Sequence, residues 1–262
     1  MCNTCGCNIT PGNRHLANRP VASGTTAVHV LQRLLAGNEA QAAANRARFH
    51  AARVLVINLM SSPGSGKTAL LEATIDALKS RWRIAVVEGD LETENDAARI
   101  RAHGVPAIQI STGSACHLDA HMLAGVLAGL PLAEIDILFV ENVGNLVCPA
   151  GFDLGQNHNV VLLSTTEGED KPAKYPVMFR QADLVLVSKA DLLPVLGDFR
   201  PEIARQAVRN LANPAPVLPV SVRGEPGIHD WLDWLEQALA ALADKPQLAT
   251  STGFRYRVSS HG

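Results

Sequence analysis

Short apolar runs separated by helix-like segments dominate the chain between residues 53 and 243. The runs are rich in β-branched residues and fall at 54–60, 84–88, 107–110, 135–141, 159–164, 183–188 and 215–220. Segments with helical spacing separate most of them, at 68–80, 94–103, 117–129, 200–212 and 228–243. Near-continuous apolar strands joined by helical crossovers predict an α/β fold with a mostly parallel, twisted sheet and helices on both faces. Ligands of such sheets bind beyond the carboxyl ends of the strands.

The two ends of the chain have different patterns. The first 24 residues are rich in Asn, Gly and Pro and lack periodicity, which predicts a flexible tether with three cysteines at its tip. Apolar residues then recur at helical spacing, which predicts one amphipathic helix packed on the main domain or on a partner. The expected segments are a tether at 1–24, a helix at 25–50, an α/β domain at 51–243 and a fraying tail at 244–262.

Composition narrows the class of protein. The 262 residues, 47% of them hydrophobic, are enough for one large α/β domain with a core. A net charge of −2 gives no general argument for a nucleic-acid partner or an anionic membrane. No apolar run approaches the ~20 residues that span a bilayer, and the polar N-terminus lacks the apolar core of a secretion signal. We therefore expect a cytoplasmic protein, and its five cysteines, an odd number, favour reactive or metal-binding thiols over a disulfide framework.

A glycine-rich loop follows the first apolar run and reads Ser61-Ser62-Pro63-Gly64-Ser65-Gly66-Lys67-Thr68. Strand, glycine-rich turn and helix is the order that aims several backbone N–H groups at one phosphate. Lys67 would reach the β- and γ-oxygens, and the Thr68 hydroxyl would bind Mg²⁺. The pattern G-x-x-x-x-G-K-[ST] is met except at its first place, where Ser61 replaces Gly. The sequence therefore predicts a nucleotide-phosphate site rather than a simple turn with a surface lysine, formed by Pro63, Gly64, Ser65, Gly66, Lys67, Thr68 and Ala69.

Acidic residues follow two further apolar runs. Asp90 comes after the run at 84–88, where a divalent ion bound next to the phosphate loop would take carboxylate oxygens. The alternative role for this acid is to cap the following helix. Glu141 ends the run at 135–141, and Gly144 follows three residues later. In nucleotide switches these places hold an acid near Mg²⁺ and a glycine that contacts the γ-phosphate, although Gly144 can also be an ordinary turn glycine.

The run at 183–188 leads into Ser188-Lys189-Ala190-Asp191, which is similar to the guanine-reading N-K-x-D motif. The Asp carboxylate accepts hydrogen bonds from guanine N1 and N2, a donor pair that adenine lacks, so the motif favours GTP over ATP. Ser188 replaces the usual Asn and weakens the motif. The base-binding candidates are Lys189 and Asp191 together with Ser221, Val222 and Arg223, which are placed like the loop that closes over the far face of a base.

Two groups of residues suit a thiophilic metal ion. Cys2, Cys5 and Cys7 place three thiolates within six residues, and such soft ligands can converge on Ni²⁺ or Zn²⁺. The alternative is a mobile reducing tail with no fixed ligand. Cys116-His117 and Cys148 follow successive strand ends, so the fold can bring two thiolates and an imidazole together. Considered alone, a Cys-His pair is more often a buried cysteine beside a surface histidine.

These motifs together resemble one family, the hydrogenase nickel-incorporation GTPases (HypB). The resemblance covers the N-terminal Cys-x-x-Cys-Gly-Cys, the phosphate loop and Gly-Asp-x-Glu-Thr-Glu-Asn-Asp after the second run. It extends to Cys-His-Leu-Asp-Ala at 116–120, Glu-Asn-Val-Gly-Asn-Leu-Val-Cys-Pro-Ala at 141–150 and Thr-Glu-Gly-Glu-Asp-Lys-Pro-x-Lys-Tyr-Pro at 166–176. The stretch at 141–150 is the most specific, because it joins a nucleotide switch to a metal-binding thiol.

The resemblance implies a P-loop GTPase whose hydrolysis of GTP to GDP drives nickel delivery to the large subunit of a nickel–iron hydrogenase. It further implies a homodimer with metal at the subunit interface and cooperation with a HypA-type nickel metallochaperone. By the family pattern Cys2, Cys5 and Cys7 hold a tight nickel site, whereas Cys116, His117 and Cys148 hold a weaker nickel or zinc site. The expected magnesium ligands are Thr68, Asp90 and Glu141, and the candidate catalytic residues are these three with Lys67 and Gly144; no general base is identified. Absence of a long histidine run argues against bulk nickel storage.

Three other functions stay open on the residues alone. A small-molecule kinase also carries Pro-Gly-Ser-Gly-Lys-Thr, but it leaves the cysteines and Asp191 unexplained. A nickel buffer or sensor would use the nucleotide only to gate metal binding. Other metal-delivery GTPases, such as the urease accessory protein, share the expected fold, but the layout of Cys116, His117 and Cys148 favours hydrogenase maturation.

Overall fold

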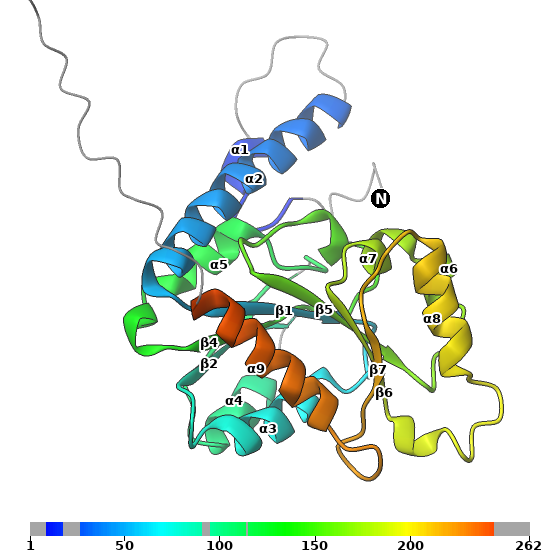
Figure 1. The fold of residues 1–262 in the computed structure, drawn as a ribbon. Coiled ribbons are helices and arrows are strands. Elements are labelled where there is room, and N and C mark those ends of the chain that lie inside the picture. Colours follow the sequence, from blue (N-terminus) through cyan, green and yellow to red (C-terminus); the bar gives the residue numbers. More distant parts are fainter. Residues whose placement is uncertain (1–8, 18–26, 91–94, 114, 244–262) are drawn as a thin grey trace, which may run out of the picture.

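Seven parallel strands form one sheet at the centre of the molecule (Figure 1), in the order β3-β2-β4-β1-β5-β6-β7. The structure is a computed structural model that describes residues 9–17, 27–90, 95–113 and 115–243. All strand pairs are parallel, which confirms the expected fold class. The strands are β1 Leu55–Ser61, β2 Ile84–Asp90, β3 Ala107–Ser111, β4 Ile137–Glu141, β5 His158–Ser164, β6 Leu184–Ser188 and β7 Val217–Pro219.

Helices connect and cover the strands. The expected ones are α2 Ala27–Ala52, α3 Lys67–Leu78, α4 Asn95–Ala102, α5 Ala120–Leu127, α8 Pro201–Asn210 and α9 His229–Ala243. The structure adds short segments without a helical repeat in the sequence: α1 Arg14–Ala17, α6 Lys171–Lys174, α7 Pro176–Arg180 and the 3₁₀ turns η1 Leu132–Glu134, η2 Pro149–Gly151 and η3 Ala190–Leu192. Among the described residues, no helix is both long and apolar enough to cross a membrane.

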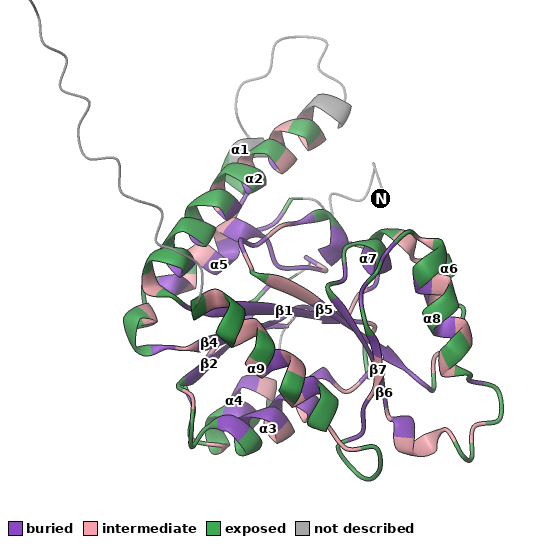
Figure 2. Cartoon of the chain, in the orientation of Figure 1, coloured by how far each residue is buried: buried purple, intermediate pink, exposed green. Residues whose placement is uncertain are grey.

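The sheet is buried on both faces, as Figure 2 shows by the purple strands between the helical layers. Successive strand residues point to opposite faces, so neighbouring residues enter different cores. Ile57 packs into the core that α3, α4 and α9 cover, which includes the fully buried Trp231 of α9. Val56 packs into the opposite core with Phe49 of α2 and Leu123 of α5. Because both faces are covered, the positions open to a ligand lie at the strand ends.

The long helix α2 packs on the main domain through two buried asparagines. Asn45 Nδ2 donates to the carbonyls of Ala120 (2.9 Å) and Leu154 (3.1 Å). Asn38 accepts from the Ala120 amide (2.9 Å) and donates to the Asp153 carbonyl (2.8 Å). These bonds fix the start of α5 and the segment after η2, and both flank the loop that carries Cys116 and His117.

Part of the expected tether is packed on the domain. Thr10 and Asn13 are buried, and the Asn13 side chain accepts from the Thr10 amide at 2.7 Å. The Thr10 hydroxyl also donates to the carboxylate of Asp119, which caps α5. The sequence does not predict this contact, because residues 9–17 have no apolar repeat; two polar side chains make it. The rest of the expected tether and the expected tail at 244–262 lie outside the described residues.

Candidate nucleotide and metal sites

The phosphate loop lies between β1 and α3 and has the backbone shape that its glycines allow. Gly64 has φ of 74° and Gly66 has φ of 95°, left-handed values that side-chain-bearing residues rarely adopt. Gly66 directly precedes α3, which begins at Lys67. The amides of the first helical turn therefore open toward the loop, where their dipoles favour an anion.

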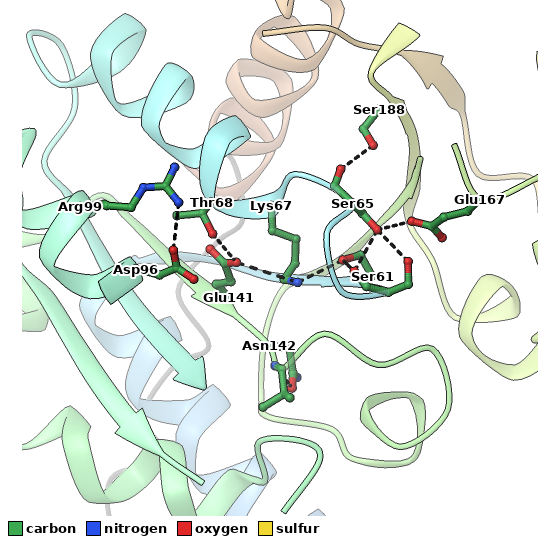
Figure 3. Close-up of polar contacts among 12 residues, drawn as sticks. Ser61, Ser65, Lys67, Thr68, Asp96, Arg99, Glu141, Asn142, Glu167 and Ser188 are labelled. Atoms are coloured by element: carbon green, nitrogen blue, oxygen red, sulfur yellow. Dashed lines mark hydrogen bonds and ion pairs between the residues drawn. The ribbon is translucent and has the colours of Figure 1, made fainter. Parts of the chain in front are cut away.

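Lys67 lies buried at the centre of this site and contacts two strand ends (Figure 3). Its Nζ donates to Ser61 Oγ at 3.1 Å and lies 3.9 Å from Glu141 Oε1 at the end of β4. Ser61, the residue that departs from the expected pattern, thus gives the lysine a partner. The Thr68 hydroxyl donates to the same Glu141 oxygen at 3.0 Å. The structure therefore brings together three of the predicted catalytic residues, Lys67, Thr68 and Glu141.

A second buried carboxyl group, Glu88, lies next to Glu141. The two residues are paired in register on β2 and β4, and only 2% and 4% of their surfaces are exposed. Burial first, and then the neighbouring carboxylate of Glu141, raise the pKa of Glu88 to about 11; burial also raises the pKa of Glu141. Asp96 at the start of α4 adds negative charge to both. The sequence reasoning missed Glu88, although an acid inside an apolar run was a signal for it.

These carboxyl groups fit a hard divalent cation. One oxygen of each, Glu88 Oε1 and Glu141 Oε2, is buried and has no hydrogen-bond partner among the described residues. A divalent ion would ionise such groups and satisfy their oxygens. The Thr68 hydroxyl, which donates to Glu141, lies beside these carboxyl groups, and its role as a metal ligand stays a prediction. Asp90 ends β2 on the same face as Glu88, and its role as a ligand stays a prediction.

The predicted γ-phosphate sensor, Gly144, packs directly on the phosphate loop. A Cβ added to Gly144 would lie 2.9 Å from Pro63 Cα and 3.0 Å from Pro63 N, closer than real Cβ atoms come. Only glycine therefore lets the loop after β4 approach this closely. The position agrees with a residue that contacts the terminal phosphate, and the contact itself stays a prediction.

A cavity of about 360 Å³ opens beside the phosphate loop. Asp191 Oδ1 accepts a hydrogen bond from Ser221 Oγ at 2.6 Å, and the amides of Arg223 and Gly224 donate to that hydroxyl at 3.1 and 3.2 Å. These bonds fix the carboxylate on the loop after β7. The cavity is lined by the predicted base-binding residues Lys189, Asp191, Ser221, Val222 and Arg223, together with Ser65, Gly66, Ala69, Leu70, Thr166, Ser188, Leu192 and Val220.

Side chains near the cavity also support the phosphate loop. Ser188 Oγ donates to the Ser65 carbonyl at 2.7 Å, so this replacement for the motif's Asn holds the loop. Lys189 Nζ donates to the Gly64 carbonyl at 2.8 Å. Glu167, in the segment after β5, accepts from Ser65 Oγ at 2.5 Å. Figure 3 shows Ser188 and Glu167 on either side of Ser65. Glu167 has a contact here that the sequence reasoning did not anticipate, because the two residues are 102 positions apart.

The predicted metal ligands Cys116, His117 and Cys148 lie together. Their ligand atoms are all within 4.8 Å of one another, and they form the one such group of three or more among the described residues. Cys116 Sγ lies 3.9 Å from His117 Nδ1. Both cysteines are free thiols, and the Nε2 atom of the fully buried His117 has no hydrogen-bond partner among the described residues. This donor set of sulfur and imidazole fits Ni²⁺ or Zn²⁺. Cys2, Cys5 and Cys7 lie outside the described residues.

Without metal, two members of this group, His117 and Cys116, are held in their uncharged forms. Burial lowers the pKa of His117 to about 4, against a smaller opposite effect of Asp119. Burial, and then the neighbouring Cys148, raise the pKa of Cys116 to about 11. Phe152 stacks on the His117 ring, with 4.0 Å between ring centroids, and fixes its orientation. A metal ion bound here would have to displace the Cys116 proton.

Comparison with known proteins decides the family. A family model described as the CobW/HypB/UreG nucleotide-binding domain matches residues 55–219. The hydrogenase maturation factor HypB of Azotobacter vinelandii is 53% identical over 221 residues, which cover 84% of this chain and 73% of that protein. The corresponding factor of Escherichia coli (strain K12) is 54% identical over 199 residues, covering 76% of this chain and 68% of that protein.

The chain belongs to the HypB family.

Solved HypB structures have the same fold. HypB from Helicobacter pylori in complex with nickel superimposes with a TM-score of 0.74 at 42% identity, covering 78% of this chain and 96% of that one. The hydrogenase maturation factor HypB from Archaeoglobus fulgidus gives a TM-score of 0.72 at 38% identity, covering 78% and 99%. The family and the P-loop architecture expected from the sequence are therefore confirmed, and the nucleotide-binding class follows from the family model.

Proposed function

We propose that this HypB-family chain is a GTP-hydrolysing nickel metallochaperone, which couples GTP binding and hydrolysis to nickel delivery during maturation of a nickel–iron hydrogenase. One observation supports the coupling most strongly. The loop that begins at Glu141, bonded to Thr68 of the phosphate loop, reaches the metal-binding thiol Cys148 seven residues later. A single short loop therefore joins the nucleotide site to the metal site.

Guanine selectivity is assigned to Asp191. Ser221 orients its carboxylate beside the cavity, where guanine N1 and N2 would donate to it. Adenine lacks that donor pair and would leave the carboxylate unpaired. The stem of Lys189 would pack along the base. The nucleotide-bound states are thus GTP and GDP.

Hydrolysis is assigned to charge stabilisation at the phosphate loop. Lys67 and the loop amides would neutralise charge on the transferred phosphoryl group. Thr68, Asp90 and Glu141 are the candidate ligands of Mg²⁺, which would supply positive charge next to the phosphate groups. Gly144 would contact the γ-phosphate and lose that contact after hydrolysis. The proposal assigns no described side chain as the general base.

Nickel handling is assigned to two sites in a cytoplasmic protein. Cys116, His117 and Cys148 form the domain site, which would take nickel or zinc, and Cys2, Cys5 and Cys7 would form the N-terminal nickel site. The proposed partners are a second copy of the chain, a HypA-type nickel metallochaperone and the large subunit of a nickel–iron hydrogenase. The proposal includes no nucleic-acid or membrane partner.

The enzyme assignment is tested by phosphate release at steady state. Purified full-length protein with Mg²⁺ should release phosphate from GTP over many turnovers, and excess ATP should not inhibit it. Inhibition by ATP at concentrations similar to GTP would contradict the guanine assignment and favour a kinase-like site. Release of less than one phosphate per chain would contradict the enzyme assignment and favour a nickel buffer gated by nucleotide.

A further inference from the structure

Asn142 lies in the predicted nucleotide switch, residues 141–144, and contacts the loop at 115–119, which carries Cys116 and His117 and is called the metal-binding loop here. We propose that its side chain positions the metal-binding loop according to the state of the nucleotide switch, so that it transmits the coupling between the two sites. This inference deepens the proposed function and rests on it, because a coupling residue requires that the nucleotide state alters metal affinity. Asn142 contacts neither predicted metal ligand nor nucleotide through any described bond, so it is a positioning residue.

The side chain of Asn142 joins two loops that are far apart in the sequence. Its Oδ1 accepts from the amide of Leu118 at 3.0 Å and from the amide of Val143 at 3.0 Å. Leu118 follows His117 directly, and Asn142 follows Glu141 directly. With only 1% of its surface exposed, Asn142 is out of reach of bulk water that could replace these bonds.

The nitrogen of the Asn142 side chain is bonded to the central sheet. Asn142 Nδ2 donates to Asn58 Oδ1 at 3.2 Å, and Asn58 Nδ2 donates to Asn159 Oδ1 at 3.0 Å. Asn58 lies in β1, the central strand of the sheet, and Asn159 lies in the neighbouring strand β5. The orientation of the Asn142 amide is therefore fixed against the sheet, while its acceptor oxygen holds both loops.

Leu118 can pass a displacement on to the metal site. Its side chain is fully buried and packs on Gly89, where an added Cβ would lie 2.7 Å from Leu118 Cγ. Gly89 lies between Glu88 and Asp90 at the end of β2. Leu118 is thus held at two points: the loop after β4 binds its amide, and β2 packs against its side chain. A shift of either strand end moves Leu118 and, through the peptide bond, His117.

The nucleotide acts on the same loop from the opposite side. Gly144, two residues after Asn142, packs on Pro63 of the phosphate loop. Glu141, one residue before Asn142, accepts the Thr68 hydroxyl. Figure 3 shows Asn142 in the loop that follows the strand bearing Glu141. Contacts that form with the γ-phosphate or Mg²⁺ would therefore act on residues before and after Asn142 in the same loop. Asn145 makes a second, half-buried bridge to the Cys116 carbonyl at 3.3 Å.

The test is the ratio of nickel affinities in two nucleotide states. Nickel sulfate is titrated into the full chain with Cys2, Cys5 and Cys7 changed to Ala, in the presence of Mg²⁺ with either GDP or a non-hydrolysable GTP analogue. Allosteric couplings usually change affinity by about 5- to 150-fold. We expect Asn142→Ala to bring the ratio to within about twofold of one, while the affinity for each nucleotide without nickel changes less than about threefold.

Asn213→Ala is the matched control. Asn213 is also a buried amide that donates to two carbonyls, those of Phe179 (2.7 Å) and Ala182 (2.8 Å), and accepts from the amide of Ala215 (2.8 Å). It contacts neither loop, so the control variant should keep the wild-type ratio. A general loss of stability would affect both variants, whereas a loss of coupling affects Asn142→Ala alone.

Each outcome has one meaning. A wild-type ratio of one overturns the coupling in the proposed function, and this inference with it. A wild-type ratio far from one that Asn142→Ala retains overturns the inference alone, even if nickel binds more weakly in both states. If Asn142→Ala does not fold, Asn58→Ala replaces it, because that change releases the Asn142 amide from the sheet. We expect Asn58→Ala to reduce the ratio, and an unchanged ratio overturns the inference.

Discussion

The phosphate loop at 61–68 has a backbone shape that its own glycines define and that distant side chains support, whereas the metal-binding loop at 115–119 is held by distant segments. Gly64, Gly66 and the start of α3 already define the phosphate loop. The metal-binding loop is held by Asn142 after β4, by α2 through the start of α5, and by Thr10 through Asp119. Single distant changes should therefore affect the phosphate site only modestly, while the metal site should respond to movement in several parts of the molecule.

The two sites also differ in charge. The phosphate end has a buried lysine beside ionisable carboxyl groups, whereas the metal end has a neutral imidazole and a protonated thiol. An anion with Mg²⁺ would enter the first, where the cation would ionise the buried carboxyl groups. A metal ion entering the second must release protons. The following variants and conditions should separate the two sites, beginning with the largest effect.

Lys67→Ala should remove phosphate chemistry and leave the metal site intact. The change deletes the cation that would neutralise the transferred phosphoryl group, and loss of one such electrostatic contact typically lowers kcat by about 10²–10³-fold. Phosphate release at saturating GTP measures the loss. Nickel affinity with the N-terminal cysteines changed to Ala and without nucleotide should not change.

The matched control is Lys79→Ala, which removes an exposed lysine that directly follows α3. It should alter phosphate release by less than about twofold, because exposed ion pairs contribute little. Phosphate release by Lys67→Ala at the wild-type rate would contradict the role assigned to this lysine.

Glu88→Gln should stabilise the protein when neither Mg²⁺ nor nucleotide is present. The pKa of Glu88 is about 11 in the folded state, against a usual 4.5. Above pH 4.5 the unfolded chain releases a proton that the folded protein keeps, so wild-type stability falls as pH rises. At pH 7.5 the wild-type protein loses up to about 4 kcal/mol of unfolding free energy in this way. Glu88→Gln avoids this loss, because glutamine does not titrate. Urea denaturation in EDTA at pH 5.0 and 7.5 should show the gain mainly at the higher pH.

Glu236→Gln provides the comparison for this pH effect. Glu236 pairs with Arg81 on the surface, and its loss should change the free energy of unfolding by less than about 1 kcal/mol at both pH values. A lower free energy of unfolding for Glu88→Gln at pH 7.5 would show that Glu88 is ionised in the folded protein.

Nickel affinity of the domain site should rise steeply with pH. The Cys116 thiol, with a pKa of about 11, must lose its proton to bind metal, so affinity should increase at least about tenfold per pH unit between pH 6.5 and 8. His117, with a pKa of about 4, is neutral throughout this range and adds no slope. Nickel titration of the variant lacking the N-terminal cysteines measures the effect.

GTP affinity measured in EDTA in the same buffers provides the internal control and should change much less, because no metal ion then displaces the proton of Glu88. A nickel affinity that is constant across this pH range would contradict the protonated state of Cys116.

Ser188→Ala should have the smallest effect. It removes the hydroxyl that donates to the Ser65 carbonyl, a bond whose loss typically costs about 1 kcal/mol. GDP affinity should fall by about fivefold, and nickel affinity without nucleotide should stay the same. Ser164→Ala is the control, because that hydroxyl contacts Thr166 and does not contact the phosphate loop. Equal effects of the two variants would contradict the supporting role of Ser188.

The contrast between the phosphate loop and the metal-binding loop also explains how much of each region the sequence predicts. The seven strands and the phosphate loop depend on local periodicity and glycine positions, so the pattern of residues 54–220 was sufficient for them. The clustering of Cys116, His117 and Cys148 followed from their places after strand ends. What holds this cluster did not, because the bond between Thr10 and Asp119 joins residues 109 positions apart. Neither polar residue has a pattern that marks its partner.

Glu88 and Asn142 illustrate a second reason. Both are polar residues at the ends of apolar strands, where a sequence pattern shows that they are unusual but not which neighbour satisfies them. Glu88 meets Glu141 only because β2 and β4 are adjacent in the sheet, although β3 lies between them in the chain. Ser188 reads as a weakened base-recognition motif in the sequence, and the structure shows that it binds the phosphate loop instead.

The central claim is that one short loop links the nucleotide state to metal affinity. Its most direct test is the nickel affinity of the full chain lacking only the N-terminal thiols, measured by titration with GDP and with a non-hydrolysable GTP analogue. The account predicts affinities that differ by at least about fivefold. Because linkage is reciprocal, nickel must change the ratio of GDP to GTP-analogue affinities by the same factor. Equal nickel affinities in the two nucleotide states would contradict the account.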